Sequence, residues 1–175
     1  MEQDLTKGNL WKQILVFSFP LMISNVLQVL FNMADVAVVG RFAGSIALGA
    51  VGSTTTLVTL FTGLLIGMAG GVNVLAARFY GAKREKDVQE TTHTAVIICL
   101  LTGILIMVLG LLFANGILEL LHTKDELIEG AALYLRIYFL GMPALAIYNF
   151  GNAVFSAVGN TKKPLYYLAT AGVIN

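Results

Sequence analysis

The sequence predicts an all-α integral membrane protein, a polytopic helix bundle that crosses the bilayer several times. Two observations lead to this fold class. First, 57% of the 175 residues are hydrophobic, only 12% are charged, and the mean hydropathy is +0.81. Soluble domains carry about 25% charged residues because their surface faces water. Second, the charged residues leave long gaps in which no charge interrupts the apolar sequence.

Those gaps predict the individual helices. A helix rises about 1.5 Å per residue and the hydrocarbon core is about 30 Å thick, so a span needs about 20 apolar residues. Four gaps reach that length. A fifth apolar run is too short and stops without a polar tail, so we expect an N-terminal fragment that ends inside its fifth helix. The predicted spans are 13–38, 45–77, 91–117 and 129–157, followed by the truncated 164–175.

The lysines and arginines predict the orientation. With a cytoplasmic N-terminus, eight of them fall on inner segments and two on outer segments, which is a clear positive-inside bias. We therefore expect a multi-pass protein of the cell membrane whose N-terminus is cytoplasmic. The inner residues are Lys7, Lys12, Arg78, Lys83, Arg84, Lys86, Lys162 and Lys163, and the outer ones are Arg41 and Lys124.

The first predicted helix carries a polar stripe. At about 100° per residue, its five polar residues share a face about 100° wide. Lipid cannot satisfy amides or a carboxylate, so this face is expected to meet protein or water. Asp35 is the candidate for a cation-responsive group, but it could instead lie at the outer interface near Arg41 and only anchor the helix end. The stripe consists of Ser18, Asn25, Gln28, Asn32 and Asp35.

Two prolines interrupt predicted helices. Pro20 removes a backbone donor from the first helix, which predicts a kink that is either passive or a movable bend. Pro143 lies in the fourth span, followed by Asn149 and Asn152, which are three residues apart on one face. Their amides need partners, either the backbone freed by Pro143 or polar groups on the first helix. They act either as polar contacts between helices or as the lining of a site.

The second helix contains Gly63, Gly67 and Gly71, each four residues apart. This double G-x-x-x-G pattern favours close packing against another helix. Serine and threonine hydroxyls on the same helix can bond to its own backbone, with cavity lining as the alternative. The hydroxyl residues are Ser53, Thr55, Thr56, Thr59 and Thr62.

Several classes of function are disfavoured. The net charge of +1 shows no basic face for nucleic acid. The single cysteine, Cys99, excludes a disulfide framework, and neither His93 nor His122 has metal-ligand spacing to a second ligand. The sequence contains no nucleotide-binding loop and no hydrolase motif. We therefore expect no enzyme, no cofactor and no resident metal, and any uphill transport must use an ion gradient or a separate partner.

Three segments resemble the multidrug and toxic compound extrusion (MATE) family. They are PLMISNVLQVLFNMADVAVVGRFAGSIALGAVG from Pro20, GMAGGVNVLAARFYGAKREKDV from Gly67 and FSAVGNTKKP from Phe155. The resemblance implies two six-helix lobes around a central cavity, with residues 1–175 forming part of the first lobe. It also implies export of cationic or amphiphilic compounds in exchange for Na⁺ or H⁺, and a C-terminal half outside this chain.

The resemblance assigns roles to particular residues. Asp35 matches an aspartate tied to cation coupling, with Na⁺ able to bind near it, and Gln28 matches the first-helix glutamine. Pro20 matches a proline at which the first helix bends. Phe31 stands where some members carry tyrosine. Two fourth-helix asparagines and one that opens an N-x-x-x-D pattern on the fifth helix are also matched; these are Asn149, Asn152 and Asn175.

Two alternatives to this transporter remain at the level of sequence. One is a small membrane scaffold or assembly protein, complete at 175 residues, that uses the glycine ridge for packing. The other is a secondary transporter of a different fold. For the antiporter, the expected partners are the lipid bilayer, a small organic substrate and the C-terminal half.

Overall fold

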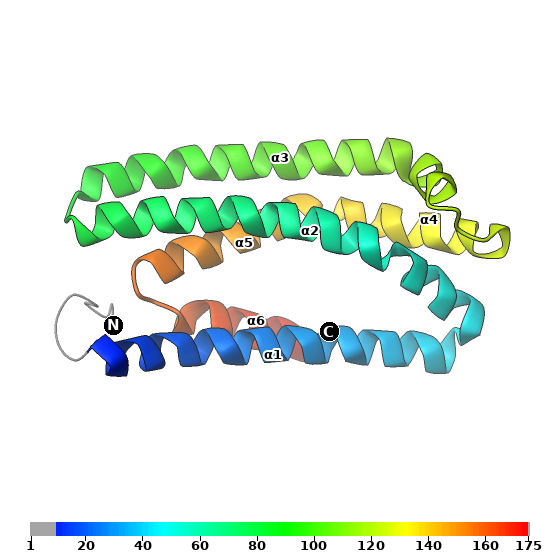
Figure 1. Ribbon diagram of the computed structural model, residues 1–175, viewed down its shortest axis with the longest axis horizontal. Coiled ribbons are helices and arrows are strands. Elements are labelled where there is room, and N and C mark those ends of the chain that lie inside the picture. The colour runs from blue at the N-terminus through cyan, green and yellow to red at the C-terminus, as the bar shows by residue number, and fades with distance from the viewer. Residues whose placement is uncertain (1–9, 175) are drawn as a thin grey trace.

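The structure is a computed structural model that describes residues 10–174, all within helices or the short turns between them (Figure 1). The three longest helices come first along the chain and three shorter helices follow. In order, they are α1 (Leu10–Phe42), α2 (Gly44–Gly81), α3 (Glu85–Leu120), α4 (Asp125–Leu140), α5 (Met142–Ala157) and α6 (Lys162–Ile174).

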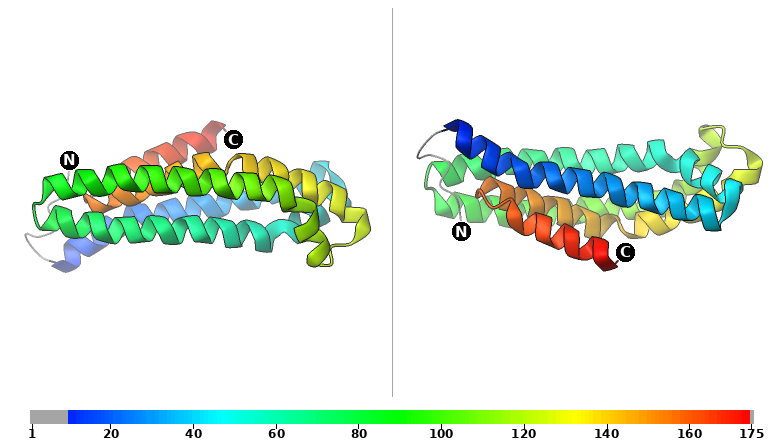
Figure 2. Two further views of the ribbon diagram at one scale, coloured as in Figure 1. Left: turned by 90° about the horizontal axis from the view of Figure 1, so that it is seen from above. Right: turned by 90° about the horizontal axis from the view of Figure 1, so that it is seen from below.

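The helices form an elongated bundle in two parts. Helices α2, α3, α4 and α5 pack on one another, whereas α1 packs along α6 and against α2. Figure 1 shows that the start of α1, the α2–α3 turn and the α5–α6 turn share one end of the bundle. The view from below in Figure 2 shows α6 lying obliquely beside α1. The inner segments predicted from the basic residues therefore gather at one end.

The length of the helices confirms a multi-pass membrane architecture. Helices α1, α2 and α3 are each long and apolar enough to cross a bilayer. Helices α4 and α5 satisfy the same test only together, because they meet at a bend of 49°. The predicted span 129–157 therefore corresponds to a broken pair of helices and not to one straight helix.

The bend between α4 and α5 has a local chemical cause. Pro143 has no N–H, so the Phe139 carbonyl four residues earlier loses its helical donor. The chain compensates with a tighter turn, in which the Gly141 N–H donates to the Tyr138 carbonyl at 3.0 Å. Helix α3 fits closely into this bend: a Cβ on Gly103 would lie 2.9 Å from the Pro143 Cα. The bend is therefore fixed by packing as well as by proline.

The core of the bundle lies beside this bend. Phe139 is 1% exposed, and its ring meets the Phe61 ring edge to face with centroids 5.2 Å apart. The same ring covers the backbone of Gly110 on α3, where any Cβ would overlap it. Leu118 and Leu135, both fully buried, complete the centre of this cluster. These contacts lock α4 against α2 and α3.

The glycine ridge of α2 does not pack as predicted. A Cβ added at Gly63, Gly67 or Gly71 would meet no described atom within 4 Å. The prediction that this ridge brings two helices together is therefore wrong for residues 10–174. The prediction for the hydroxyls is confirmed in part, since Ser53 donates to the Ala50 carbonyl at 2.7 Å, along its own helix.

Candidate functional site

The polar stripe of α1 lies on an exposed face of the helix. Asn25, Gln28, Asn32 and Asp35 are all exposed within the described chain. Helix α1 makes no backbone contact with α4 or α5 among residues 10–174. Residues 10–174 therefore leave Asp35 exposed and do not distinguish a cation-responsive role from an anchor at the helix end. A polar face on a spanning helix still requires water or protein opposite it, because lipid satisfies neither amides nor carboxylates.

Side chains reach across to this face from the bent pair. Gln28 hydrogen-bonds with the hydroxyl of Tyr148 on α5. Asp35 interacts electrostatically with Tyr134 on α4. Two positions of the α1 stripe, seven residues or about 10 Å apart along the axis, thus each interact with a tyrosine, Gln28 through a hydrogen bond and Asp35 through its charge. The residues of the bent pair that interact with the first helix are therefore tyrosines, and not the asparagines Asn149 and Asn152 for which such partners were predicted.

A third tyrosine extends this polar surface toward α2. The rings of Tyr134 and Tyr138 stack with centroids 6.3 Å apart, and the Tyr138 hydroxyl lies 2.9 Å from Thr62 Oγ1. Thr62 was expected to bond to its own helix or to line a cavity; its bond crosses to α4. The surface formed by Gln28, Asp35, Tyr134, Tyr138 and Tyr148 is called the tyrosine face below.

Sequence reasoning did not single out these tyrosines. The available signal was the spacing of four between Tyr134 and Tyr138, which places both on one side of α4. Tyrosine in a membrane helix is more often an interfacial anchor, so spacing alone did not distinguish the two roles.

The two asparagines of α5 have different surroundings. Asn149 Nδ2 donates to the Leu145 carbonyl at 2.9 Å, four residues earlier in the same helix. This carbonyl is not the one freed by Pro143, so neither partner expected for Asn149 is found. The Oδ1 atom of Asn152 is buried and has no hydrogen-bond partner among the described residues. A buried amide oxygen without a donor costs about 1–3 kcal/mol, so the Asn152 side chain lowers the stability of the described bundle.

Helix α5 is also tied to α2 through an asparagine that the sequence did not highlight. Asn73 Nδ2 donates to the Ala153 carbonyl at 2.7 Å, next to Asn152. This bond joins residues 80 positions apart in sequence. It holds the face of α5 that carries the two asparagines in a fixed register on α2.

Of the remaining predicted site residues, Pro20 and Asn32 lie on α1 and Asn175 follows α6 in the sequence. Helix α1 continues through Pro20 without a break, and the Ser24 hydroxyl donates to the Pro20 carbonyl at 2.9 Å. Movement at Pro20 stays a prediction. Asn32 lies between Gln28 and Asp35 on the stripe, without a described partner. Asn175 lies outside the described residues.

Helix α6 packs close to the polar face of α1. The ring of Phe31 rests on the backbone of Gly172, where there is no room for a Cβ. At the other end, the Thr161 hydroxyl donates to the Phe17 carbonyl at 3.3 Å. The C-terminal part of α6 is thereby held one turn from Asp35.

The chemistry of the tyrosine face suits a small hard cation or a proton. Carboxylate, amide and phenol oxygens are hard ligands, of the type preferred by cations that do not bind sulfur or imidazole. Among residues 10–174 there is no group of three histidine, cysteine or acidic side chains that could hold a metal ion. Asp35 is the one acidic residue in α1, since Glu2 and Asp4 precede the helix.

Comparison with known proteins bears on the identity of the fold and the family. The family model described as MatE matches residues 20–175. The probable multidrug resistance protein YoeA of Bacillus subtilis is 33% identical over 173 residues, covering 99% of this chain and 37% of that protein. The probable multidrug resistance protein YpnP of the same organism is 34% identical over 174 residues, covering 98% and 39%.

Solved structures agree with this match. A crystal structure of MATE in the bent conformation superimposes with a TM-score of 0.87 at 25% sequence identity, covering 95% of this chain and 37% of that one. The chain therefore spans less than two fifths of the length of these relatives. The alternative of a transporter with a different fold is wrong.

Proposed function

The chain belongs to the MatE family of membrane transporters, and we propose that the intact protein exports organic cations or amphiphiles in exchange for H⁺ or Na⁺. Members of this family are transporters and not enzymes. In this proposal residues 1–175 supply most of the first of two lobes, and a C-terminal half supplies the second. The protein lies in the cell membrane with its N-terminus in the cytoplasm.

The tyrosine face carries the proposal. Asp35 is an ionisable group within a spanning helix, and such residues mark ion or substrate pathways. Its interaction with Tyr134, together with the bond between Gln28 and Tyr148, links α1 to the bent pair α4–α5. Because the backbone of α1 makes no contact with that pair, these side-chain interactions are the ones that a change of charge on Asp35 would alter.

The mechanism is alternating access driven by that charge. Binding of H⁺ or Na⁺ neutralises Asp35 and changes its interaction with Tyr134, so that α1 repacks against α4 and α5. Exchange requires that the two arrangements bind the coupling ion and the substrate with different affinity, since equal binding to both shifts no equilibrium. Asn32, Asn149, Asn152 and Asn175 are proposed to join this site.

Pro20 is the proposed bending point of α1. It leaves the carbonyl of residue 16 without its helical donor, which makes this turn the easiest to deform.

Transport by the intact protein in liposomes tests the function. Ethidium serves as the organic cation, and pH and Na⁺ gradients are imposed separately, with a control in which neither gradient is present. The proposal expects ethidium to move against its concentration when one of the two gradients is imposed. Equal ethidium distribution under every gradient would refute it.

A further inference from the structure

A groove of about 530 Å³ lies between α2 and α3. Its floor includes Ala95 and Cys99, which are buried and also pack on Phe150 of α5. Its rim includes the exposed side chains of Leu75 and Ile98. The groove therefore opens on the surface of α2 and α3 that faces away from α5. Its volume is within the range of about 300–1,000 Å³ that is usual for ligand sites.

The glycine ridge of α2 helps to create this space. Gly71 lines the groove, and a Cβ there would meet no described atom within 4 Å. The glycines of α2, from which close helix packing was predicted, thus leave open space that no described helix fills. Met68 and Val72 line the groove beside it and make that end apolar.

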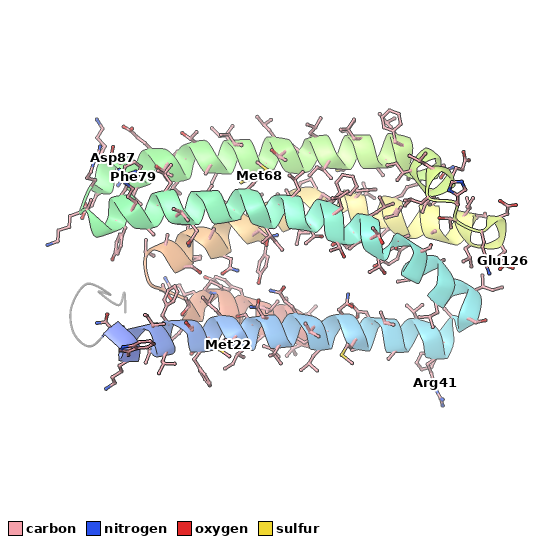
Figure 3. All side chains as sticks on the ribbon, viewed as in Figure 1. Met22, Arg41, Met68, Phe79, Asp87 and Glu126 are labelled. Atoms are coloured by element: carbon pink, nitrogen blue, oxygen red, sulfur yellow. The ribbon has the colours of Figure 1, made fainter. Side chains whose placement is uncertain are left out.

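The groove becomes polar toward the α2–α3 turn. Glu90, Thr91 and Thr94 line this end. Arg78 follows Leu75 by three residues on the same face of α2, which places it one turn beyond the groove. Figure 3 shows where this end lies, with Met68 toward the middle of the bundle and Phe79 and Asp87 beside the turn.

The charges at this end are not all engaged with one another. Arg84 donates to both carboxylate oxygens of Asp87, at 2.7 and 2.9 Å, and so forms a closed pair. The Lys86 ammonium lies 3.9 Å from Glu90, but the two side chains are 87% and 67% exposed. Such a pair contributes little in water. Glu90 therefore remains able to accept a ligand, at the same end of the bundle as the exposed residue Arg78.

We propose that this groove binds a zwitterionic phospholipid with a primary ammonium headgroup, of the phosphatidylethanolamine type. One acyl chain fills the apolar part beside Gly71 and Cys99. The ammonium group donates to Glu90 and the threonine hydroxyls, and the phosphate accepts from Arg78. Two opposite charges at one end of an apolar groove match a zwitterion better than an anionic lipid. The proposal requires only that the chain lies in a bilayer, and it does not depend on transport.

Native mass spectrometry of the intact protein tests the headgroup. The protein is released from liposomes that contain equal amounts of phosphatidylethanolamine, phosphatidylcholine and phosphatidylglycerol. We expect preferential retention of phosphatidylethanolamine, and about tenfold weaker retention in Glu90→Gln, which loses one charged hydrogen bond. Glu119→Gln, at the far end of the same helix, is the matched control and should retain the lipid. Equal retention of the three lipids, or no effect of Glu90→Gln, would overturn the proposal.

A second pair of variants tests the groove itself. Gly71→Leu places an apolar side chain in the groove, and its Cβ meets no described atom within 4 Å, whereas Gly63→Leu adds the same side chain to the same ridge outside the groove. Only Gly71→Leu should release the lipid. Release of the lipid by Gly63→Leu as well, or its retention by both variants, would also overturn the proposal.

Discussion

Replacement of Gly110 by alanine tests how the bend between α4 and α5 is held. The alanine Cβ would lie well inside 3.0 Å of three atoms of the Phe139 ring. That ring is 1% exposed and is fixed by its edge-to-face contact with Phe61. The ring has no space into which to rotate, so α4 has to move away from α3.

The expected magnitude follows from two opposing terms. Overpacking of a well-packed core costs about 1–3 kcal/mol. Replacing glycine by alanine within a helix contributes about 0.8–1.0 kcal/mol in the stabilising direction. Gly110→Ala should therefore lose up to about 2 kcal/mol of unfolding free energy. Gly116→Ala is the matched control in the same helix, because its Cβ would meet nothing within 4 Å, and it should gain about 1 kcal/mol.

Unfolding of the purified protein in micelles by titrated SDS, followed by circular dichroism, measures both variants. The difference between them isolates the steric cost, since the helix-propensity term is common to both. A Gly110→Ala variant as stable as Gly116→Ala would show that Gly110 does not hold the bend through Phe139.

Three further predictions concern the polar groups around the tyrosine face. Asn152→Leu removes the buried Oδ1 that has no described partner. It should leave the unfolding free energy unchanged or raise it by up to about 3 kcal/mol, while ethidium export falls. A lower unfolding free energy would contradict this prediction. Thr62→Val and Tyr138→Phe each remove one hydroxyl of a 2.9 Å hydrogen bond. A double-mutant cycle on the unfolding free energy should give a coupling of about 0.5–1.5 kcal/mol, and a coupling of zero would contradict the prediction. Tyr148→Phe removes the hydroxyl that hydrogen-bonds with Gln28, and it should slow ethidium export several-fold at unchanged expression. Tyr166 is an exposed tyrosine on α6, and Tyr166→Phe is the control that should leave export unchanged.

The sequence was sufficient for the long helices because the bilayer sets their length. A charge-free apolar run of 20 or more residues is long enough to cross the hydrocarbon core as one helix. The boundaries of α1 and α2 extend beyond the predicted spans because a helix continues past the hydrocarbon region until a turn is needed.

The effect of each proline depended on its neighbours. Pro20 leaves α1 continuous, whereas Pro143 accompanies a bend of 49°. The second proline follows Gly141, and Gly103 on α3 makes room for the bend. Sequence identifies both as weak points, but only tertiary packing determines which of them bends.

Of the two parts of the candidate site, only the part on α1 could be predicted from the sequence. The stripe from Gln28 to Asp35 is visible in sequence as polar residues within an apolar run. Its partners, Tyr134 and Tyr148, are not, because tyrosine is common in membrane helices for other reasons. The glycine ridge shows the same limit, since one pattern serves both a packed interface and an open groove.

Gradient-driven ethidium export by the intact protein carrying Asp35→Asn most directly tests whether this carboxylate couples the ion to the substrate. The substitution keeps the size of the side chain and removes its ability to change charge. Asp125→Asn, at the start of α4, controls for the loss of a carboxylate elsewhere. We expect export to be lost in Asp35→Asn and retained in Asp125→Asn. Export at the wild-type rate by Asp35→Asn would contradict the account.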